Sequence, residues 1–502
     1  MRIPPLLLLV SLAFSGVTQD INKLTQAHIE NNGVQILEDF KTLLSIPNVA
    51  FDLPNVNANA RYISEEFEKR GVETKLLRMV GTPPIVYGYL PVKSATQTIA
   101  FYVHYDGQPV DKTKWVNKPW EPTYYSEAIF NGGQPMPFPT SSEEINEDHR
   151  IYARSAGDDK APIIALLSAL DLIQSNQLKI SSNLIFFFEG QEEAGSKQLQ
   201  QYLNDNRALI DEIDLWLFCD GPVHQSRRPQ LVFGVRGVTG MEVTVYGPNR
   251  PLHSGHYGNW APVPGQLLAD LIASMKDEDG NVLIDGYYDD IEPLSELEKE
   301  ALANVPQIDV DLKKELGINN PEGTESYNER LLRPSLTIRG LSSGNTGELA
   351  RNVVPATATA SIGIRLVKGC LPEKQKDLVE AHIRKQGFHI VRETPDLETR
   401  LKYPKIALVT RSSGYPAART SMDLPILQQV IKKSKEVAGE ELILLPTLGG
   451  SLPLYLFTDV LDKPAIIVPI ANHDNNQHAA NENLRIGNLW YGISLMAALM
   501  TF

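Results

Sequence analysis

Two adjacent carboxylates follow one of the most apolar runs of this sequence. Glu192 and Glu193 stand in the stretch EGQEEAGS, directly after the run NLIFFF. Adjacent like charges repel, and carboxylates near a core are costly unless something neutralises them. The pair therefore predicts a cation at this position. It also raises the question of whether the two glutamates have the same role.

Polar side chains end other apolar runs in the same way. We predict buried strands over residues 98–106, 183–190, 214–221 and 464–474. In open α/β sheets, ligand sites lie at the carboxyl ends of the strands. The side chains found at these ends are His104 and Asp106, Glu192 and Glu193, Asp220, and those of the region 473–478. Their types predict a site built from histidines and carboxylates at one edge of the sheet.

Two short patterns in the sequence have more than one interpretation. His104 and Asp106 are two residues apart, so on a strand they face the same side. The carboxylate would then orient a metal-binding histidine, although such a pair alone is more often a simple hydrogen-bonded pair. Asp158 and Asp159 precede a predicted helix, where they would either cap the helix or bridge two cations.

The pattern of apolar residues predicts an α/β protein with a second domain inserted. Runs that are apolar on both faces indicate a mostly parallel sheet sandwiched by helices, which we expect over 161–175 and 425–439. Alternating patterns over 240–247 and 356–369 are typical of half-exposed antiparallel strands. We therefore expect a catalytic domain in two parts, interrupted by an α+β domain. The predicted bounds are 19–233 and 415–502 for the catalytic parts and 234–414 for the insertion.

The N-terminal segment has the composition of a secretory signal peptide. MRIPPLLLLVSLAFSGVTQD contains one basic residue, an apolar centre and then small residues. The apolar centre is shorter than the roughly 20 residues that cross a bilayer. We therefore expect residues 1–18 to be removed, with cleavage between Ser15 and Gln19, and the mature protein to be periplasmic or secreted, with no membrane partner.

The charge and the cysteine content of the sequence bear on its partners and on its disulfides. The formal net charge of −14 over 502 residues argues against a nucleic-acid partner. The only cysteines are Cys219 and Cys370, far apart in the chain. A chain of this length buries enough apolar surface to be stable without disulfides, so we interpret both as unpaired structural residues.

Seven motifs occur in an order that resembles the M20-type zinc peptidases, most closely the carnosinase-like and non-specific dipeptidase branch. They are HYDGQP, SAGDDKAP, EGQEEAGS, FCDG, HSGHYGN, RNVVPATATASIGIRLV and HAANENL. The resemblance extends from about residue 35 to the C-terminus. The sequence departs from the family at 154–155, which read RS where Arg-Gly is common. It departs again at 160–161, which read KA where Lys-Gly is common.

The resemblance implies five ligands for two zinc ions, with cobalt or manganese as possible substitutes. His104 and Asp220 would hold one ion, Glu193 and His478 would hold the other, and Asp158 would bridge both. His473 competes with His478 for this role, but the spacing of HAANE matches the final motif of the family. The two neighbouring glutamates would therefore differ in function.

The resemblance also implies the residues of catalysis. Glu192 would be the general base, and Asp106 would orient the first histidine ligand. His253 would reach over the site from the inserted domain of a partner subunit and stabilise the oxyanion. The inserted domain would thus be a lid and a dimerisation domain, and the protein a homodimer.

Four further positions resemble those that contact substrate in the family. Arg365 would grip a substrate carboxylate, which a guanidinium fits with two hydrogen bonds. Asn352, Gly450 and Ser451 would complete the contacts. The function implied is hydrolysis of dipeptides, or removal of a terminal residue from short peptides, with either end as the point of attack. The alternative is an N-acyl-amino-acid deacylase with the same metal machinery.

Overall fold

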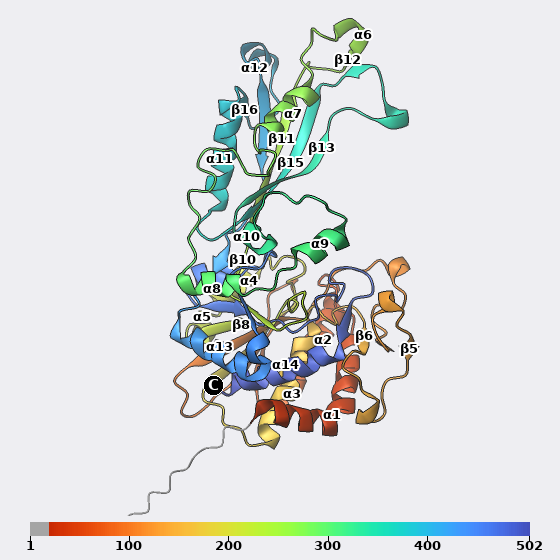
Figure 1. Cartoon of the computed structure of the whole chain (residues 1–502), viewed down its shortest axis with the longest axis vertical. Helices are drawn as coiled ribbons and strands as arrows, with labels where there is room; N and C mark the ends of the chain where they lie inside the picture. Colours follow the sequence, from red (N-terminus) through yellow and green to blue (C-terminus); the bar gives the residue numbers. More distant parts are fainter. Residues whose placement is uncertain (1–19) are drawn as a thin grey trace, which may run out of the picture.

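The computed structural model describes residues 20–502, so the predicted signal peptide lies outside the described residues. Figure 1 shows an elongated molecule with a broad half, which contains both ends of the described chain, and a narrower half built on a second sheet. Within residues 20–502, no helix combines the length and the apolar character that crossing a membrane would require.

The broad half is built on an eight-stranded mixed sheet. Its order is β1 (Glu73–Leu77), β2 (Ile85–Leu90), β7 (Asn183–Glu189), β3 (Thr98–His104), β8 (Leu215–Phe218), β20 (Ala465–Ile467), β9 (Gln230–Val232) and β19 (Ile443–Leu445). The four central strands β7, β3, β8 and β20 are mutually parallel. These are the four strands predicted from the apolar runs. The antiparallel pairs lie toward the edges, where β1, β2 and β9 join.

Helices cover both faces of this sheet, which confirms the predicted α/β class. One face packs against α1 (Ile21–Leu44), α2 (Leu53–Glu68), α3 (Lys160–Ser175), α13 (Pro425–Ala438) and α14 (Ile486–Met500). The other face packs against α4 (Leu199–Asp205) and α5 (Arg207–Ile210). Helix α3 is buried along most of its length, which explains why its sequence is apolar on nearly all sides.

A small sheet at the side of this half positions one of the site loops. Its order is β21 (Asn483–Arg485), β6 (Arg150–Tyr152), β4 (Thr123–Tyr125) and β5 (Pro135–Met136). Strands β21 and β6 are antiparallel neighbours. Their pairing brings residues near 480 beside the loop that leads from β6 to α3.

The narrow half, called the lid here, is a five-stranded sheet with helices on one face. The order is β13 (Ser335–Ser342), β15 (Thr357–Leu366), β11 (Gly237–Tyr246), β17 (Ile406–Arg411) and β16 (His389–Val391). Buried residues of β11 and β15 pack against α7 (Pro264–Ala273) and α11 (Pro372–Lys385). The alternating sequences predicted this arrangement, because buried and less buried residues alternate along β15 and along β11 from Met241 to Val245.

The remaining elements belong to the lid or connect it to the broad half, which holds the predicted catalytic domain and is the catalytic half of the molecule. The end of the lid carries β12 (Leu252–His253), α6 (Ser254–Tyr257) and β14 (Val353–Val354), and the other helices of the lid are α9 (Asp309–Leu316), α10 (Tyr327–Leu331) and α12 (Leu397–Lys402). Helix α8 (Glu296–Ala303) contacts strand β19 of the eight-stranded sheet. Strands β10 (Gly234–Val235) and β18 (Ala418–Arg419) pair where the chain enters and leaves the lid. The lid sheet lies within the predicted insertion, whose bounds of 234–414 stay a prediction.

Candidate metal centre and active site

The carboxyl ends of three parallel strands bring most of the predicted ligands together. His104 is the last residue of β3, and its partner in register is Glu189, the last residue of β7. Glu193 follows in the loop after β7, and Asp220 lies two residues beyond β8. Because these strands are parallel neighbours, their ends open at the same edge of the sheet.

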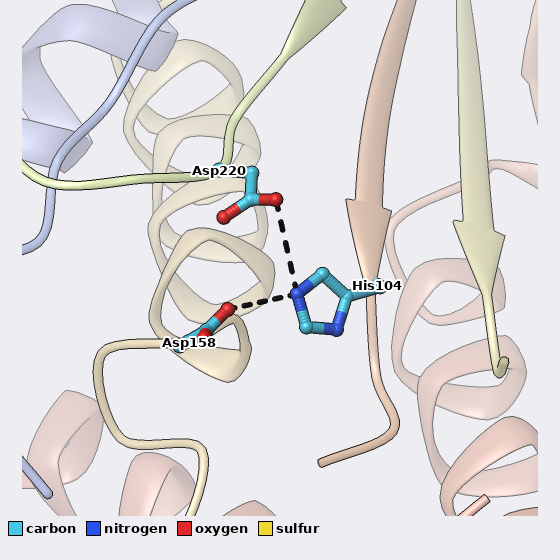
Figure 2. A group of neighbouring side chains, drawn as sticks. All are labelled: His104, Asp158 and Asp220. Carbon is cyan, nitrogen blue, oxygen red and sulfur yellow. Dashed lines mark hydrogen bonds and ion pairs between the residues drawn. The ribbon is translucent and has the colours of Figure 1, made fainter. Parts of the chain in front are cut away.

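Loops from two other places complete the set with Asp158 and His478. The Nε2 atom of His104 lies 2.9 Å from Asp158 Oδ1 and 3.9 Å from Asp220 Oδ2 (Figure 2). The Nε2 atom of His478 lies 3.1 Å from Asp158 Oδ2 and 3.2 Å from Glu193 Oε2. The five side chains therefore form two groups of three, and Asp158 belongs to both with one oxygen in each.

The chemistry of the donors fits divalent metal ions. Within each group the ligand atoms all lie within 4.8 Å of one another. Burial lowers the pKa of His104, but hydrogen bonds to Asp106 and Asp158 outweigh burial and hold that pKa well above its ordinary value. Burial, reinforced by the charge of Asp158, raises the pKa of Asp220 to about 7. Metal ions bound here would offset the negative charge that these buried carboxylates gather.

Asp106 contacts both a ligand of the first group, His104, and the loop that carries Glu193, a ligand of the second group. Its Oδ1 atom lies 3.5 Å from the Nδ1 atom of His104, and its side chain is fully buried. The same carboxylate accepts the backbone N–H groups of Glu192 at 3.0 Å and Glu193 at 3.1 Å. Asp106 thus orients the imidazole and also fixes the loop that carries both glutamates.

Glu192 lies beside the ligands without belonging to either group. It lines a cavity of about 350 Å³ together with Asp158, Asp220 and His478. Burial, with a further contribution from the neighbouring carboxylates, raises the pKa of Glu192 well above its ordinary value. The two glutamates therefore occupy different positions, and the geometry gives only Glu193 a place among the ligands.

Three of the predicted substrate contacts meet at the wall of this cavity. Gly450 and Ser451 line it directly. Arg365, on lid strand β15, donates a hydrogen bond of 2.5 Å from Nη1 to the Oγ atom of Ser451. A lid residue and a loop of the catalytic half thus converge beside the candidate centre.

The two remaining predicted residues lie elsewhere. His253 is exposed on β12 at the far end of the lid, where its Nδ1 accepts the backbone N–H of Gly255 at 3.1 Å. Asn352 lies beside it, and its carbonyl accepts the N–H of Ser254. Figure 1 shows β12 and α6 at the end of the molecule opposite the catalytic sheet. A single chain does not bring these residues to the centre, so their roles stay predictions that need a second chain.

The two cysteines and the alternative histidine ligand His473 all lie outside the ligand groups. Cys219 is buried among apolar residues, with Sγ 3.9 Å from Met496 Sδ, and it belongs to neither ligand group. Both cysteines are unpaired and buried. His473 belongs to neither ligand group, and its loop neighbour Asp474 instead pairs with Arg150 at 2.7 Å.

Three buried or half-buried residues, Gln108, Asp159 and Glu482, support the ligands. The sequence assigned no role to Gln108 or Glu482, and it predicted a helix cap or a bridge between two cations for Asp159. The side-chain amide of Gln108 donates to Glu193 Oε2 at 2.7 Å. Asp159 precedes α3 but does not cap it, and its Oδ2 accepts the N–H of His104 at 3.3 Å instead. Glu482 holds the loop of the shared ligand. All three occur inside the recognised motifs, which is the only signal that marks them.

Glu482 is a buried clamp for the loop that carries Asp158. One oxygen accepts the N–H groups of Gly157 at 3.0 Å and Asp158 at 2.9 Å. The other accepts the N–H of Ser155 at 2.9 Å and pairs with Arg154 at 2.7 Å. Because His478 lies four residues before Glu482, this clamp also links the loops of two ligands.

Replacement of Glu482 with glutamine is expected to destabilise the catalytic half by about 3–5 kcal/mol, because Arg154 loses its buried partner and an amide N–H₂ faces backbone donors. Urea denaturation with and without added metal measures this loss. The matched control is Glu121→Gln, which removes an exposed pair with Lys118 and should change little. Equal urea midpoints of unfolding for Glu482→Gln and Glu121→Gln would contradict the stabilising role of Glu482.

Comparison with known proteins agrees with this geometry. The sequence model of the peptidase family M20/M25/M40 matches residues 100–501. The chain therefore belongs to this family, and it is a metal-dependent peptidase. It is 26% identical over 469 residues to the Cys-Gly metallodipeptidase dug1 of Schizosaccharomyces pombe, covering 90% of this chain and 92% of that protein. It is 26% identical to the Beta-Ala-His dipeptidase of Mus musculus, in an alignment that covers 83% of this chain and 79% of that protein.

Solved structures share the fold. An M20 family metallo-carboxypeptidase from Sulfolobus solfataricus superposes with a TM-score of 0.73 at 27% identity, covering 93% of this chain and 98% of that one. Human carnosine dipeptidase 1 superposes with a TM-score of 0.65 at 20% identity, and the superposition covers 96% of this chain and 99% of that one. At that identity the second likeness shows the fold alone.

Proposed function

We propose that this chain is an exported dizinc dipeptidase that hydrolyses dipeptides or removes a terminal residue from short peptides. The observation that carries the proposal is the pair of three-ligand groups sharing Asp158, with Glu192 beside them and outside both. The names of the related proteins, Cys-Gly metallodipeptidase and Beta-Ala-His dipeptidase, support the substrate class. The composition of residues 1–18 supports export.

Two zinc ions are the metals that this ligand set favours. Each group offers one histidine nitrogen and two carboxylates, a combination that suits zinc and that cobalt or manganese also accept. When bound, such a pair of ions activates water and polarises the scissile carbonyl. His104 and Asp220 would hold one ion, and Glu193 and His478 the other.

Residues of the chain would carry out proton transfer, substrate binding and stabilisation of the oxyanion. The carboxylate of Glu192 takes the proton of the attacking water and passes it to the leaving amine, because it lines the cavity beside the ligands without belonging to either group. Arg365 and Ser451 bind the carboxylate of the substrate at the wall of the cavity. In a homodimer, His253 of one subunit would donate to the developing oxyanion in the site of the other.

The test is hydrolysis of a dipeptide panel that includes Cys-Gly and β-Ala-His by the mature protein. We expect turnover that falls at least about a hundredfold after chelation and returns with added zinc, cobalt or manganese. The control is the N-acetylated form of each dipeptide, which lacks the free amine. Faster hydrolysis of the acetylated forms would instead identify a deacylase, and no turnover on any member of the panel would reject the proposal.

A further inference from the structure

Tyr415 lies between lid strand β17 and strand β18, where the chain leaves the lid. It forms an isolated antiparallel bridge with Val238 of β11, in which the two residues exchange backbone hydrogen bonds of 2.9 and 3.0 Å. Pro416, the next residue, favours extended backbone at Tyr415. A Cβ atom at the preceding Gly414 would collide with the carbonyl of Val238, so glycine permits this close approach. The sequence Gly-Tyr-Pro therefore fixes the backbone of Tyr415 against the lid sheet.

The register of this sheet places Tyr415 on the same face as Arg365. Val238 pairs with Tyr415 on one side and with Arg365 of β15 on the other. Residues in register on neighbouring strands project to the same face of a sheet. Ile364 and Leu366, which flank Arg365, are buried in the core that the lid helices cover. Tyr415 and Arg365 therefore both project from the opposite face.

Both side chains reach the same segment of the catalytic half. The Nη1 atom of Arg365 donates to the Oγ atom of Ser451 at 2.5 Å. The ring of Tyr415 stacks on the ring of Tyr455 in the same segment, with 5.5 Å between the ring centroids and 11° between the ring planes. This stack holds the tyrosine ring, and with it the hydroxyl, in one orientation.

The charges that act on the Tyr415 hydroxyl connect it with the active site. Burial raises the pKa of Tyr415, and the charge of Glu192 raises it further. The charge of Arg365 and the hydroxyl of Ser451 lower this pKa, but burial outweighs them. The phenol therefore lies near all three side chains, and it stays protonated at neutral pH, so that it can donate a hydrogen bond.

Arg365 is left without an acidic partner. It is exposed, and within residues 20–502 no carboxylate forms an ion pair with it. Asp459, from the same segment of the catalytic half, pairs instead with Lys368 at 3.0 Å. Ser451 accepts the hydrogen bond from Arg365 and keeps its own O–H to donate. One guanidinium and two hydroxyls thus offer donors to an anion with several acceptor positions.

We propose that the Tyr415 hydroxyl binds the carboxylate of the substrate as a third donor, beside Arg365 and Ser451. This inference rests on the proposed function, which places that carboxylate at Arg365 and Ser451. A carboxylate has about four acceptor positions, so it can take the guanidinium and both hydroxyls together. Tyr415 thus helps the site to select substrates with a free carboxyl end, because an amide at that end is uncharged and offers fewer acceptor positions.

The test is the steady-state kinetics of Tyr415→Phe in the metal-loaded full chain, on the dipeptide of the panel that the unaltered chain hydrolyses fastest. Phenylalanine keeps the ring that stacks on Tyr455 and removes only the hydroxyl. We expect KM to rise at least about tenfold while kcat stays within about twofold, because the carboxylate is bound equally before and during the reaction. On the same dipeptide with a C-terminal amide, kcat/KM should differ between the two chains by less than about threefold.

Tyr403→Phe is the matched control. Tyr403 is another stacked tyrosine of the lid, with its ring centroid 3.5 Å from that of His389, and it belongs to neither the ligand groups nor the cavity. Removal of its hydroxyl should leave both kinetic constants unchanged. Equal metal content per chain checks that both variants are folded.

Two results would overturn the inference and leave the proposed function intact. The first is an unchanged KM in Tyr415→Phe. The second is a fall in kcat with KM unchanged, because the hydroxyl would then act on Glu192 and not on the substrate. If the unaltered chain turned over no dipeptide, the proposed function itself would be rejected, and the inference with it.

Discussion

Replacing Glu192 with glutamine is expected to reduce dipeptide turnover by about 10²–10⁴-fold while the protein keeps both metal ions. Glutamine has nearly the same shape but accepts no proton, so the step assigned to Glu192 is lost. The metal should stay because Glu192 belongs to neither ligand group. The backbone hydrogen bond from Glu192 to Asp106 also survives the change.

The measurement combines kcat on one dipeptide with metal content per chain. Glu193→Gln is the matched control, because it makes the same replacement of a carboxylate by an amide at the adjacent residue. It should lose affinity for one metal, since Glu193 Oε2 lies 3.2 Å from His478 within the second group. If Glu192→Gln turned over normally, or if it lost metal as Glu193→Gln does, the two glutamates would not have the roles proposed here.

Replacing Asp158 with asparagine is expected to weaken both metal sites at once. One carboxylate oxygen faces His104 and the other faces His478, so no other single residue belongs to both groups. Asparagine offers one neutral oxygen in place of two charged ones. The loss of affinity should exceed the roughly 10–100-fold caused by losing a residue that only supports a ligand. Hydrolysis should fall to background.

Metal titration against a competing chelator measures this effect site by site. Asp220→Asn and Glu193→Gln are the comparisons, because each alters one group and should weaken one site. Their combined effect should resemble that of Asp158→Asn alone. A variant Asp158→Asn that retained one metal with unaltered affinity would show that Asp158 is not shared.

The centre of the catalytic fold was predictable because its strands are short apolar runs with polar ends. Strands β3, β7, β8 and β20 were all found this way, and parallel pairing then places His104, Glu193 and Asp220 at one edge. The antiparallel neighbours β1 and β9 were not predicted. Their residues are only partly apolar or their length is three residues, so they carry little periodic signal.

The contacts that hold the ligands were harder to predict from sequence. Glu482 and Asp158 are 324 positions apart, and only the pairing of β21 with β6 makes them neighbours. The role of His253 came from the family resemblance alone, which assigned it to the site of a partner subunit, because its place in the sequence relates it to none of the predicted strand ends.

The position of β20 sets the order in which the two halves of the chain can be completed during synthesis. This strand begins at Ala465 but lies between β8 and β9, which both end by Val232. The lid sheet, in contrast, comes from the contiguous stretch between Gly237 and Arg411. Because domains fold as units while the chain emerges, the lid can reach its final form first. The catalytic sheet must wait for residues 465–467, and its second histidine ligand arrives later still.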